Sequence, residues 1–167
     1  TVENMHQQFA TFLRNIPFYG LAVACIDHPV VRELLDRLEL RRNGRRLLTY
    51  GTTAAADLVL TSARVEGSTT FFDAELGPRL NGGARSLKNW SVPIPGQHNA
   101  LNALAAIAAA SEAGIADGTI RAAMATFAGV KRRFQLTGRW NGIAIYDDYG
   151  HHPVEIEVPQ GAVEVVG

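Results

Sequence analysis

The stretch Leu21-Ala22-Val23-Ala24-Cys25-Ile26 is an uninterrupted apolar run, and it decides the fold class. A helix is predicted at about residues 30–40, and the run from Arg46 to Tyr50 predicts a second strand. A strand, a helix and a strand in this order form a βαβ unit, whose strands are parallel and whose crossover is right-handed. The sequence therefore predicts an α/β protein with parallel strands and covering helices.

The apolar pattern changes after Tyr50 from a helical to an alternating period. Three strands are predicted at 56–65, 69–76 and 86–94, separated by turn-forming residues such as Asn81-Gly82-Gly83. Strands joined by short turns pair with their neighbours in antiparallel fashion. We therefore expect a small antiparallel sheet after the βαβ unit.

Helices are predicted before and after these strands in the sequence. Apolar residues spaced three and four apart mark an N-terminal helix that stops at Pro17, and they are Val2, Met5, Phe9, Phe12, Leu13 and Ile16. Two helices are predicted at 98–113 and 117–127, the second capped by Asp117 or Thr119, and we expect both to cover the parallel strands. Asn141-Gly142 then predicts a hairpin between strands at 134–140 and 143–146.

Composition limits the class of protein and its partners. The chain has 167 residues and a formal net charge of zero, which offers no electrostatic attraction for nucleic acid. Its longest apolar stretch, Ala103 to Ala110, is far shorter than the roughly 20 residues of a membrane-spanning helix, so no membrane insertion is expected. Cys25 is the single cysteine and excludes an internal disulfide, which fits a cytoplasmic protein. The basic run from Arg41 to Arg46 is interpreted as a turn rather than a phosphate site.

The stretch Tyr146-Asp147-Asp148-Tyr149-Gly150-His151-His152-Pro153 crowds acids, phenols and imidazoles behind an apolar strand. Carboxylates accept hydrogen bonds from sugar hydroxyls, a tyrosine ring stacks on a base, and histidine donates to a phosphate or exchanges a proton near neutral pH. These residue types suggest a nucleotide-using enzyme. The alternative is a polar turn after an edge strand.

A second polar stretch, Pro95-Gly96-Gln97-His98-Asn99-Ala100-Leu101-Asn102, opens the Ala-rich helix. Asn99 and Asn102 are three residues apart, which places both amides on one side of the first helical turn. There they and the free backbone N–H groups can meet a polar ligand. The alternative is that this stretch only caps the helix, with His98 orienting its start.

The order of three motifs resembles the Mur ligases of peptidoglycan synthesis. The motifs are HNALNALAAIA from His98, GVKRRF from Gly129 and DDYGHHPVEI from Asp147. The likeness begins earlier, with Phe9, Phe12, Pro17-Phe18-Tyr19-Gly20, residues 22–27 and Thr49-Tyr50-Gly51, and covers about residues 5–156. The branch that joins L-alanine to UDP-N-acetylmuramate fits best. A murein peptide recycling ligase and a non-catalytic nucleotide-binding module remain as alternatives.

This resemblance implies an ATP-dependent ligation, in which the muramic carboxylate is phosphorylated and the amine of L-alanine attacks the acyl phosphate. It implies that Asn99 and Asn102 meet the adenine end of ATP, that Tyr149 packs on the base and that Asp148 holds the ribose. Two further roles follow from the resemblance: Arg133 bridges the nucleotide site to the last domain, and His151 lies near the phosphates and the amino acid. Supporting positions are implied for His98, Asp147 and His152.

Parts of the family pattern are absent from this sequence. It has no Gly-rich loop ending in Gly-Lys-Ser/Thr to hold phosphates, and the Mg²⁺ ligands of the family cannot be assigned in it. We therefore expect residues 1–130 to be the latter part of the central ATP-binding domain and residues 131–167 to be a hinge and the start of the C-terminal domain. From about residue 157 the tail is atypical, since Pro159 and Gly161 disfavour a helix. The isolated chain is predicted to be inactive.

Overall fold

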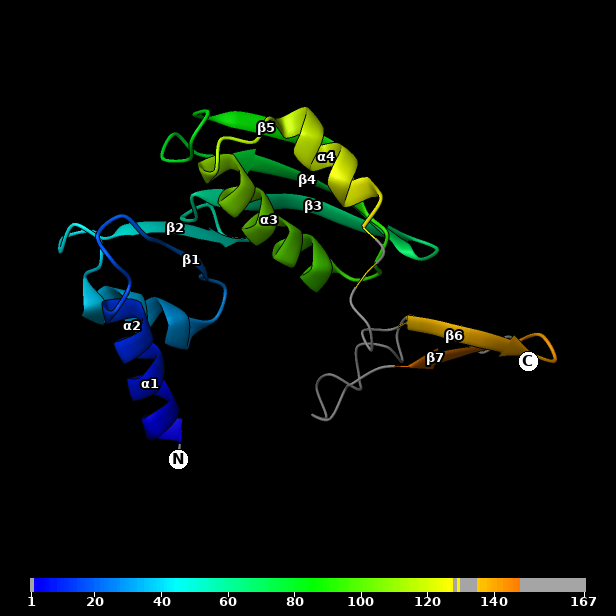
Figure 1. Ribbon diagram of the computed structural model, residues 1–167, viewed down its shortest axis with the longest axis horizontal. Helices are drawn as coiled ribbons and strands as arrows, with labels where there is room; N and C mark the ends of the chain where they lie inside the picture. Colours follow the sequence, from blue (N-terminus) through cyan, green and yellow to red (C-terminus); the bar gives the residue numbers. More distant parts are fainter. Residues whose placement is uncertain (1, 128, 130–134, 148–167) are drawn as a thin grey trace.

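The computed structural model of the chain describes residues 2–127, 129 and 135–147, which form a mixed α/β domain and a hairpin (Figure 1). The helices are α1 (Val2–Arg14), α2 (Pro29–Leu38), α3 (Gln97–Glu112) and α4 (Asp117–Ala125). The strands are β1 (Leu21–Cys25), β2 (Arg46–Gly51), β3 (Leu58–Glu66), β4 (Thr69–Leu76), β5 (Arg85–Val92), β6 (Gln135–Trp140) and β7 (Ile143–Asp147). The α/β class and the order of the elements are confirmed.

The βαβ unit consists of β1, α2 and β2. The two strands pair in parallel over their length, from Leu21 opposite Arg46 to Cys25 opposite Tyr50. The helix begins after His28, whose ring nitrogen Nδ1 accepts a hydrogen bond of 3.3 Å from the backbone of Val30. The predicted parallel pairing is thus confirmed, and α2 supplies the crossover between the two strands.

The antiparallel strands continue the same sheet. The strand order is β1-β2-β3-β4-β5, and the pairs β3–β4 and β4–β5 are antiparallel as predicted. Strand β3 joins β2 in parallel through two residue pairs alone, Tyr50 with Leu58 and Gly51 with Val59. Strand β3 therefore starts where β2 ends, and the parallel and antiparallel parts form one staggered sheet.

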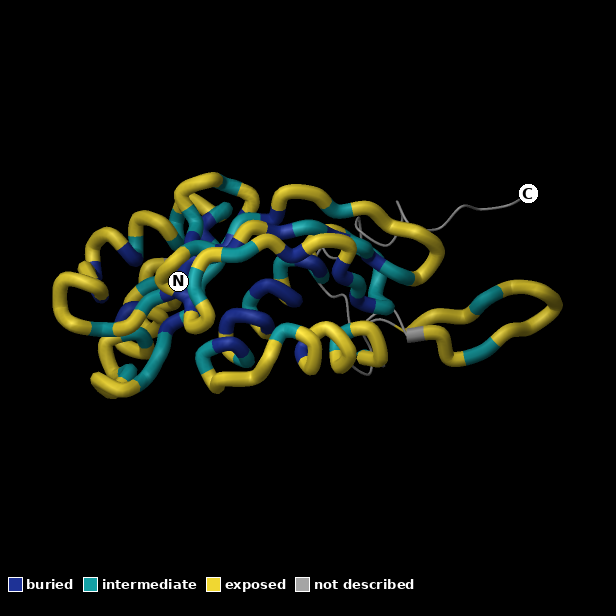
Figure 2. The backbone as a smooth tube through the Cα atoms, turned by 90° about the horizontal axis from the view of Figure 1, so that it is seen from above, coloured by how far each residue is buried: buried dark blue, intermediate teal, exposed yellow. Residues whose placement is uncertain are grey.

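Helices cover the two faces of this sheet differently. On one face α3 crosses the strands, and Leu104 and Ile107 pack with Leu58 and Phe72 in the fully buried core. On the other face of β1 and β2, α1 and α2 close a second core around Ala22. Figure 2 shows the buried segments inside this body. Helix α4 packs on β5 and α3, so the expectation that it covers the parallel strands is wrong.

The β6–β7 hairpin turns at Asn141 and Gly142, as predicted. Both residues have positive φ angles, 47° and 84°, which the twist of a two-residue hairpin turn requires. Most of its described residues are exposed (Figure 2). The predicted hinge at 129–134 lies outside the described residues except for Gly129, so the domain boundary stays a prediction.

The basic run between α2 and β2 forms ion pairs, which supports its interpretation as a turn. Arg41 pairs with Asp57, Arg42 with Glu39, and Arg46 with Glu112. No helix in the described part of the chain is long and apolar enough to span a membrane.

Candidate functional site

The loop that leads into α3 is held by strand β4. The hydroxyl of Thr70, which is fully buried, donates a hydrogen bond of 2.7 Å to the carbonyl of Ile94. Gly96 then begins the helix with a φ of 113°, a conformation that residues with a Cβ rarely adopt. No side chain caps the first backbone N–H groups of α3. The helix start is therefore fixed in place, while its N–H groups keep the capacity to bind an acceptor.

The three predicted residues at this helix start have different surroundings. The Asn99 amide, half-buried, donates a hydrogen bond of 2.8 Å to the Pro95 carbonyl. Asn102 is exposed, and its side chain forms no hydrogen bond with another described residue. The exposed His98 ring lies so close to Gly96 that a Cβ there would be 2.5 Å from the ring carbon Cε1. Gly96, which belongs to this stretch, is the N-cap, and neither asparagine side chain caps the helix, so the choice between a capping role and a ligand-binding role stays open.

The second predicted cluster is described only in part. Asp147 is the last residue of β7, pairs in register with Gln135 and is exposed. It belongs to the hairpin sheet, whereas His98, Asn99 and Asn102 belong to α3. The other predicted site residues lie outside the described part of the chain, and their roles stay predictions; they are Arg133, Asp148, Tyr149, His151 and His152.

The carboxyl ends of β1 and β2 bring together a polar pair that sequence reasoning missed. The Asp27 carboxylate accepts a hydrogen bond of 2.8 Å from the backbone N–H of Thr52. A Cβ at Gly51 would lie 2.3 Å from Asp27 Oδ1, so this approach requires glycine. Burial raises the pKa of the Tyr50 hydroxyl, with smaller contributions from Cys25 and Asp27. The sequence did contain a signal for this pair, namely polar residues just after two predicted parallel strands. Ligands of open α/β sheets bind at the carboxyl ends of the strands.

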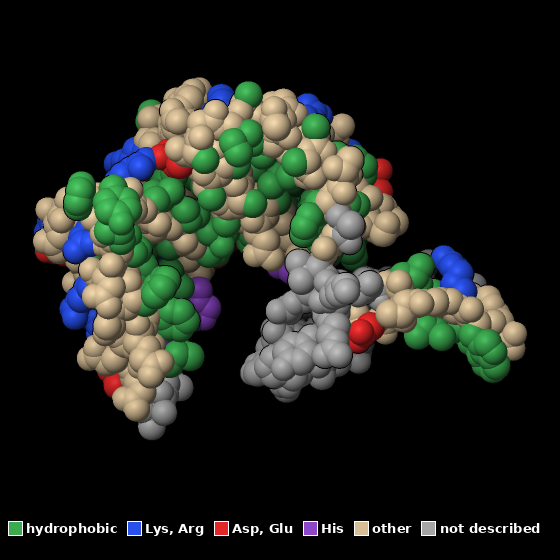
Figure 3. All heavy atoms as spheres, in the orientation of Figure 1, with side chains coloured by type: hydrophobic (Ala, Val, Ile, Leu, Met, Phe, Trp, Pro, Cys, Tyr) green, Lys and Arg blue, Asp and Glu red, His purple; other side chains and the backbone are tan. Residues whose placement is uncertain are grey.

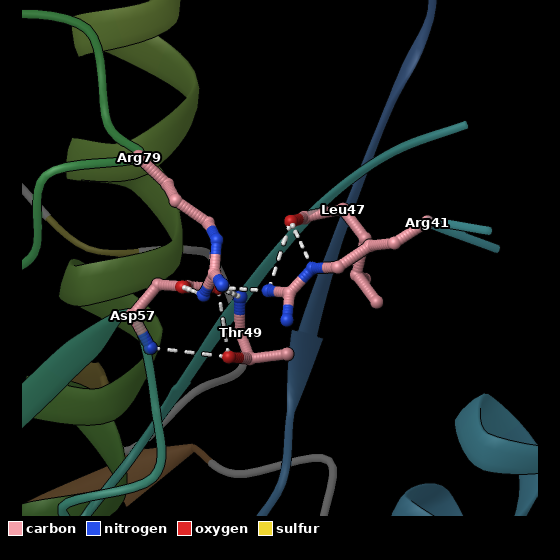
Figure 4. A network of polar contacts seen from close by, with 5 residues as sticks. All are labelled: Arg41, Leu47, Thr49, Asp57 and Arg79. Atoms are coloured by element: carbon pink, nitrogen blue, oxygen red, sulfur yellow. Dashed lines mark hydrogen bonds and ion pairs between the residues drawn. The ribbon is translucent and has the colours of Figure 1, made fainter. Parts of the chain in front are cut away.

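A second missed cluster surrounds Asp57, just before β3 (Figure 4). Its carboxylate accepts hydrogen bonds from the Thr49 backbone at 2.8 Å, the Thr49 hydroxyl at 2.9 Å and Arg79 Nη1 at 2.8 Å. Arg41 also binds this carboxylate and the carbonyl of Leu47. Strand β3 is thereby tied to β2 where the backbone pairing between them is short.

The electrostatics of Asp57 suit a structural role. Burial alone would raise the pKa of this carboxyl group, but the hydrogen bonds from Arg79 and Thr49 and the charge of Arg41 outweigh it and lower the pKa. A carboxylate that stays ionised and fully hydrogen-bonded is a weak proton acceptor. Asp57 therefore organises the β2–β3 junction rather than catalysing a reaction.

The sheet, its covering helices and the polar start of α3 define a layered α/β domain whose loops can bind a polar ligand. Residues 1–110 match the family model of the Mur ligase middle domain. The chain belongs to the Mur ligase family.

Two relatives have the same name and the same degree of similarity. The chain is 49% identical over 156 residues to the UDP-N-acetylmuramate–L-alanine ligase of Rhodopseudomonas palustris (strain HaA2). The enzyme of that name from Nitrobacter winogradskyi is also 49% identical. The match covers 93% of this chain and 32% of each relative, so the chain spans about a third of their length.

Solved structures share this fold at low sequence identity. UDP-N-acetylmuramate–alanine ligase from Thermotoga maritima has a TM-score of 0.72 and 24% identity over 97% of this chain and 33% of its own. Folylpolyglutamate synthetase from Lactobacillus casei has a TM-score of 0.73 and 17% identity over 97% of this chain and 39% of its own. The MurF ligase of Thermotoga maritima, solved in complex with ADP, has a TM-score of 0.68 and 19% identity over 97% of this chain and 34% of its own. At such identities the likeness concerns the fold alone.

Proposed function

We propose that this chain supplies part of the ATP site of a ligase that joins L-alanine to UDP-N-acetylmuramate through an acyl phosphate. The observation that carries the proposal is the 49% identity over 93% of the chain to ligases of that name. The reaction serves peptidoglycan synthesis, and through it cell shape and division, and it takes place in the cytoplasm. The substrates, ATP and Mg²⁺ belong to the whole enzyme, and Mg²⁺ is held by residues outside this chain.

The start of α3 supports a nucleotide site. Asn102 is exposed, and the first N–H groups of α3 have no side-chain cap, so donors and acceptors are available near the start of this helix. In the proposed site Asn99 and Asn102 bind the adenine end, Tyr149 packs on the base and Asp148 holds the ribose. Arg133 and His151 act near the phosphates, with His98, Asp147 and His152 in support.

The test of this proposal is ADP release by a chimera. In the chimera this chain replaces the 156-residue segment that it matches in the Rhodopseudomonas palustris (strain HaA2) ligase. We expect release that needs both UDP-N-acetylmuramate and L-alanine. Release with a peptide in place of L-alanine would instead support a peptide recycling ligase, and a folded chimera that binds ATP without turnover would support a non-catalytic module.

The isolated chain should release no ADP under the same conditions. It lacks the glycine-rich phosphate loop in its sequence, and the preorganised positive groups that stabilise a transferring phosphoryl group contribute much of the rate. L-alanine-dependent release by the purified chain, measured with ATP, Mg²⁺ and UDP-N-acetylmuramate, would contradict the assignment of phosphate chemistry to other segments.

Alanine substitutions of the two asparagines of α3 should separate an effect on stability from an effect on nucleotide binding. Asn99→Ala removes the bond to the Pro95 carbonyl and should lower the free energy of unfolding by about 1 kcal/mol. Asn102→Ala removes no bond to a described residue and should leave stability within about 0.5 kcal/mol. In the chimera Asn102→Ala should raise the KM for ATP about 5-fold or more, as loss of one hydrogen bond predicts. An unchanged KM for ATP would remove Asn102 from the proposed site.

A further inference from the structure

Strand β4 carries a hydroxyl group inside the apolar core. Thr70 is fully buried, and it pairs with Val65 of β3 on one side and with Val92 of β5 on the other. A buried hydroxyl lowers stability unless it is hydrogen-bonded, whereas a valine in its place has no such requirement. The role of Thr70 is therefore decided by the partner of its hydroxyl.

That partner belongs to the loop between β5 and α3. The hydroxyl of Thr70 donates to the Ile94 carbonyl at 2.7 Å, and the Gly96 carbonyl lies 3.4 Å from the same oxygen. A hydroxyl has one proton to donate, so the shorter contact is the bond. The Gly96 carbonyl instead accepts the backbone N–H of Asn99 at 3.0 Å. The loop is thus attached at Ile94 to a strand that is paired on both sides.

The loop leaves little freedom to Ile94. Pro93 and Pro95 flank this residue, and each proline ring fixes its own φ angle and restricts the residue before it. The backbone N–H of Ile94 donates to the Val92 carbonyl at 2.8 Å. Since the loop is short and stiff, a displacement of Ile94 would also displace Gly96, where α3 begins.

The side chain of Ile94 approaches a second segment, the chain that follows α4. A Cβ built at Gly129 would lie 3.9 Å from Cδ1 and 4.0 Å from Cγ1 of Ile94, which is ordinary van der Waals contact. Gly129 opens the predicted hinge at 129–134 and has a φ of 81°. Figure 3 shows hydrophobic side chains of the domain next to the point where the chain leaves α4. Ile94 therefore lies next to both the start of α3 and the first residue of the hinge.

We propose that Thr70 is a positioning residue of the nucleotide site, which acts through Ile94 on both the start of α3 and the hinge. Because it is fully buried, Thr70 binds no nucleotide itself. In the proposed site Asn99 binds the adenine end of ATP, and Arg133, which belongs to the hinge, acts near the phosphates. One hydrogen bond from β4 thus fixes the loop on which both ends of the site depend. This inference rests on the proposed function.

Thr70→Val in the chimera tests the proposal, because it removes the donor and nearly keeps the size of the side chain. We expect the KM for ATP to rise about 5-fold or more, the effect of losing one hydrogen bond. The KM for UDP-N-acetylmuramate should change less than about 2-fold, since the start of α3 belongs to the ATP site alone. Thr70→Ser keeps the hydroxyl and should retain the wild-type KM for ATP. An unchanged KM for ATP in Thr70→Val, or an equal rise in Thr70→Ser, would overturn the proposal.

Thr49→Val is the matched control for general stability. Thr49 is also buried on a strand, and its hydroxyl bonds to Asp57 at the β2–β3 junction. Both valine substitutions should lower the Tm of the isolated chain by roughly 3 °C or more, but only Thr70→Val should raise the KM for ATP in the chimera. A similar rise in Thr49→Val would show that the KM follows stability and not the bond to Ile94.

NMR spectra of the isolated chain test the structural step without turnover. Thr70→Val should shift the amide signals of Gly96, Asn99 and Gly129, whereas Thr49→Val should leave these three signals in place. Signals of Gly96 and Asn99 that do not move in Thr70→Val would overturn the proposal whatever the chimera does.

Ile94→Ala separates the two consequences of the Thr70 bond. It keeps the carbonyl that Thr70 binds and removes the Cγ1 and Cδ1 atoms near Gly129. The amide signal of Gly129 should therefore move, while that of Gly96 stays. A shift at Gly96 as large as that in Thr70→Val would contradict the role given to the hydroxyl.

Failure of this inference is distinguishable from failure of the proposed function. If the chimera binds ATP without turnover, the dissociation constant for ATP from calorimetry replaces the KM, and the same rise in Thr70→Val is expected. ATP affinity that does not respond to Thr70→Val overturns this inference alone. Affinity that responds in a chimera that does not join L-alanine contradicts the proposed function alone.

Discussion

Asp57→Ala should lower the free energy of unfolding by about 2–4 kcal/mol, because it removes the acceptor that joins β2 to β3. The substitution leaves the buried N–H and hydroxyl of Thr49 without the carboxylate that accepts from both. The two arginines that also bind Asp57 are partly exposed and can turn to water, which keeps the loss below that of a fully buried ion pair. Urea unfolding followed by circular dichroism measures the change.

Glu66→Ala is the matched control, since it also removes an acid that pairs with an arginine. Glu66 and Arg64 are both more than half exposed, and such surface pairs contribute at most about 1 kcal/mol. Equal effects of the two substitutions would show that the Asp57 cluster contributes no more than a surface ion pair.

The stability from Asp57 should also depend on pH in a defined direction. Because the folded state lowers the pKa of this carboxyl group below its ordinary value of 3.8, the stabilisation is fully present above that value. It is lost as the pH falls through the folded pKa, where the native carboxylate takes up its proton. The difference in unfolding free energy between wild type and Asp57→Asn should therefore be constant near about pH 6 and shrink below about pH 4. A difference that grows on acidification would contradict this assignment.

The local elements of this fold could be predicted because they depend on nearby residues. Alternating apolar residues and Asn-Gly or Gly-Gly turns predict the strands, and helical spacing predicts α1. The parallel β2–β3 pairing could not be predicted, since parallel neighbours ordinarily need a long crossover and these two strands meet over two residue pairs. The Asp57 cluster depends on that junction and was missed with it.

Side chains with distant partners also escaped prediction. Asp117 was expected to cap α4, but Ala116 is the N-cap, and the Asp117 carboxylate binds both Nε and Nη2 of Arg85 at 2.6 and 2.8 Å. At the candidate site, the helical spacing of Asn99 and Asn102 was predictable. The bond from Asn99 to Pro95 and the packing of His98 on Gly96 follow from a loop conformation that no local pattern specifies.

Gly96→Ala should lower the free energy of unfolding by about 2–3 kcal/mol and displace the start of α3. Its backbone, with φ 113° and ψ 139°, lies in a region that is costly for any residue with a Cβ. The added methyl group would also lie 2.5 Å from Cε1 and 2.8 Å from Nδ1 of His98. In the chimera the same substitution should raise the KM for ATP, because the loop that carries Asn99 must move. Thermal unfolding and ATP titration measure the two effects.

Gly118→Ala is the control for the effect of replacing a glycine by alanine where the backbone is helical and unstrained. Apart from its chain neighbours and the backbone of its own helix, no described atom lies within 4 Å of a Cβ built at Gly118. This residue is in α4, so alanine should add up to about 1 kcal/mol of stability. A double-mutant cycle with His98→Ala then separates the two causes at Gly96, because removing the ring relieves the clash and leaves the backbone strain. If Gly96→Ala costs as much without the His98 ring, backbone conformation alone makes glycine necessary. If most of the loss is recovered, the packing of His98 against Gly96 is what positions the start of α3.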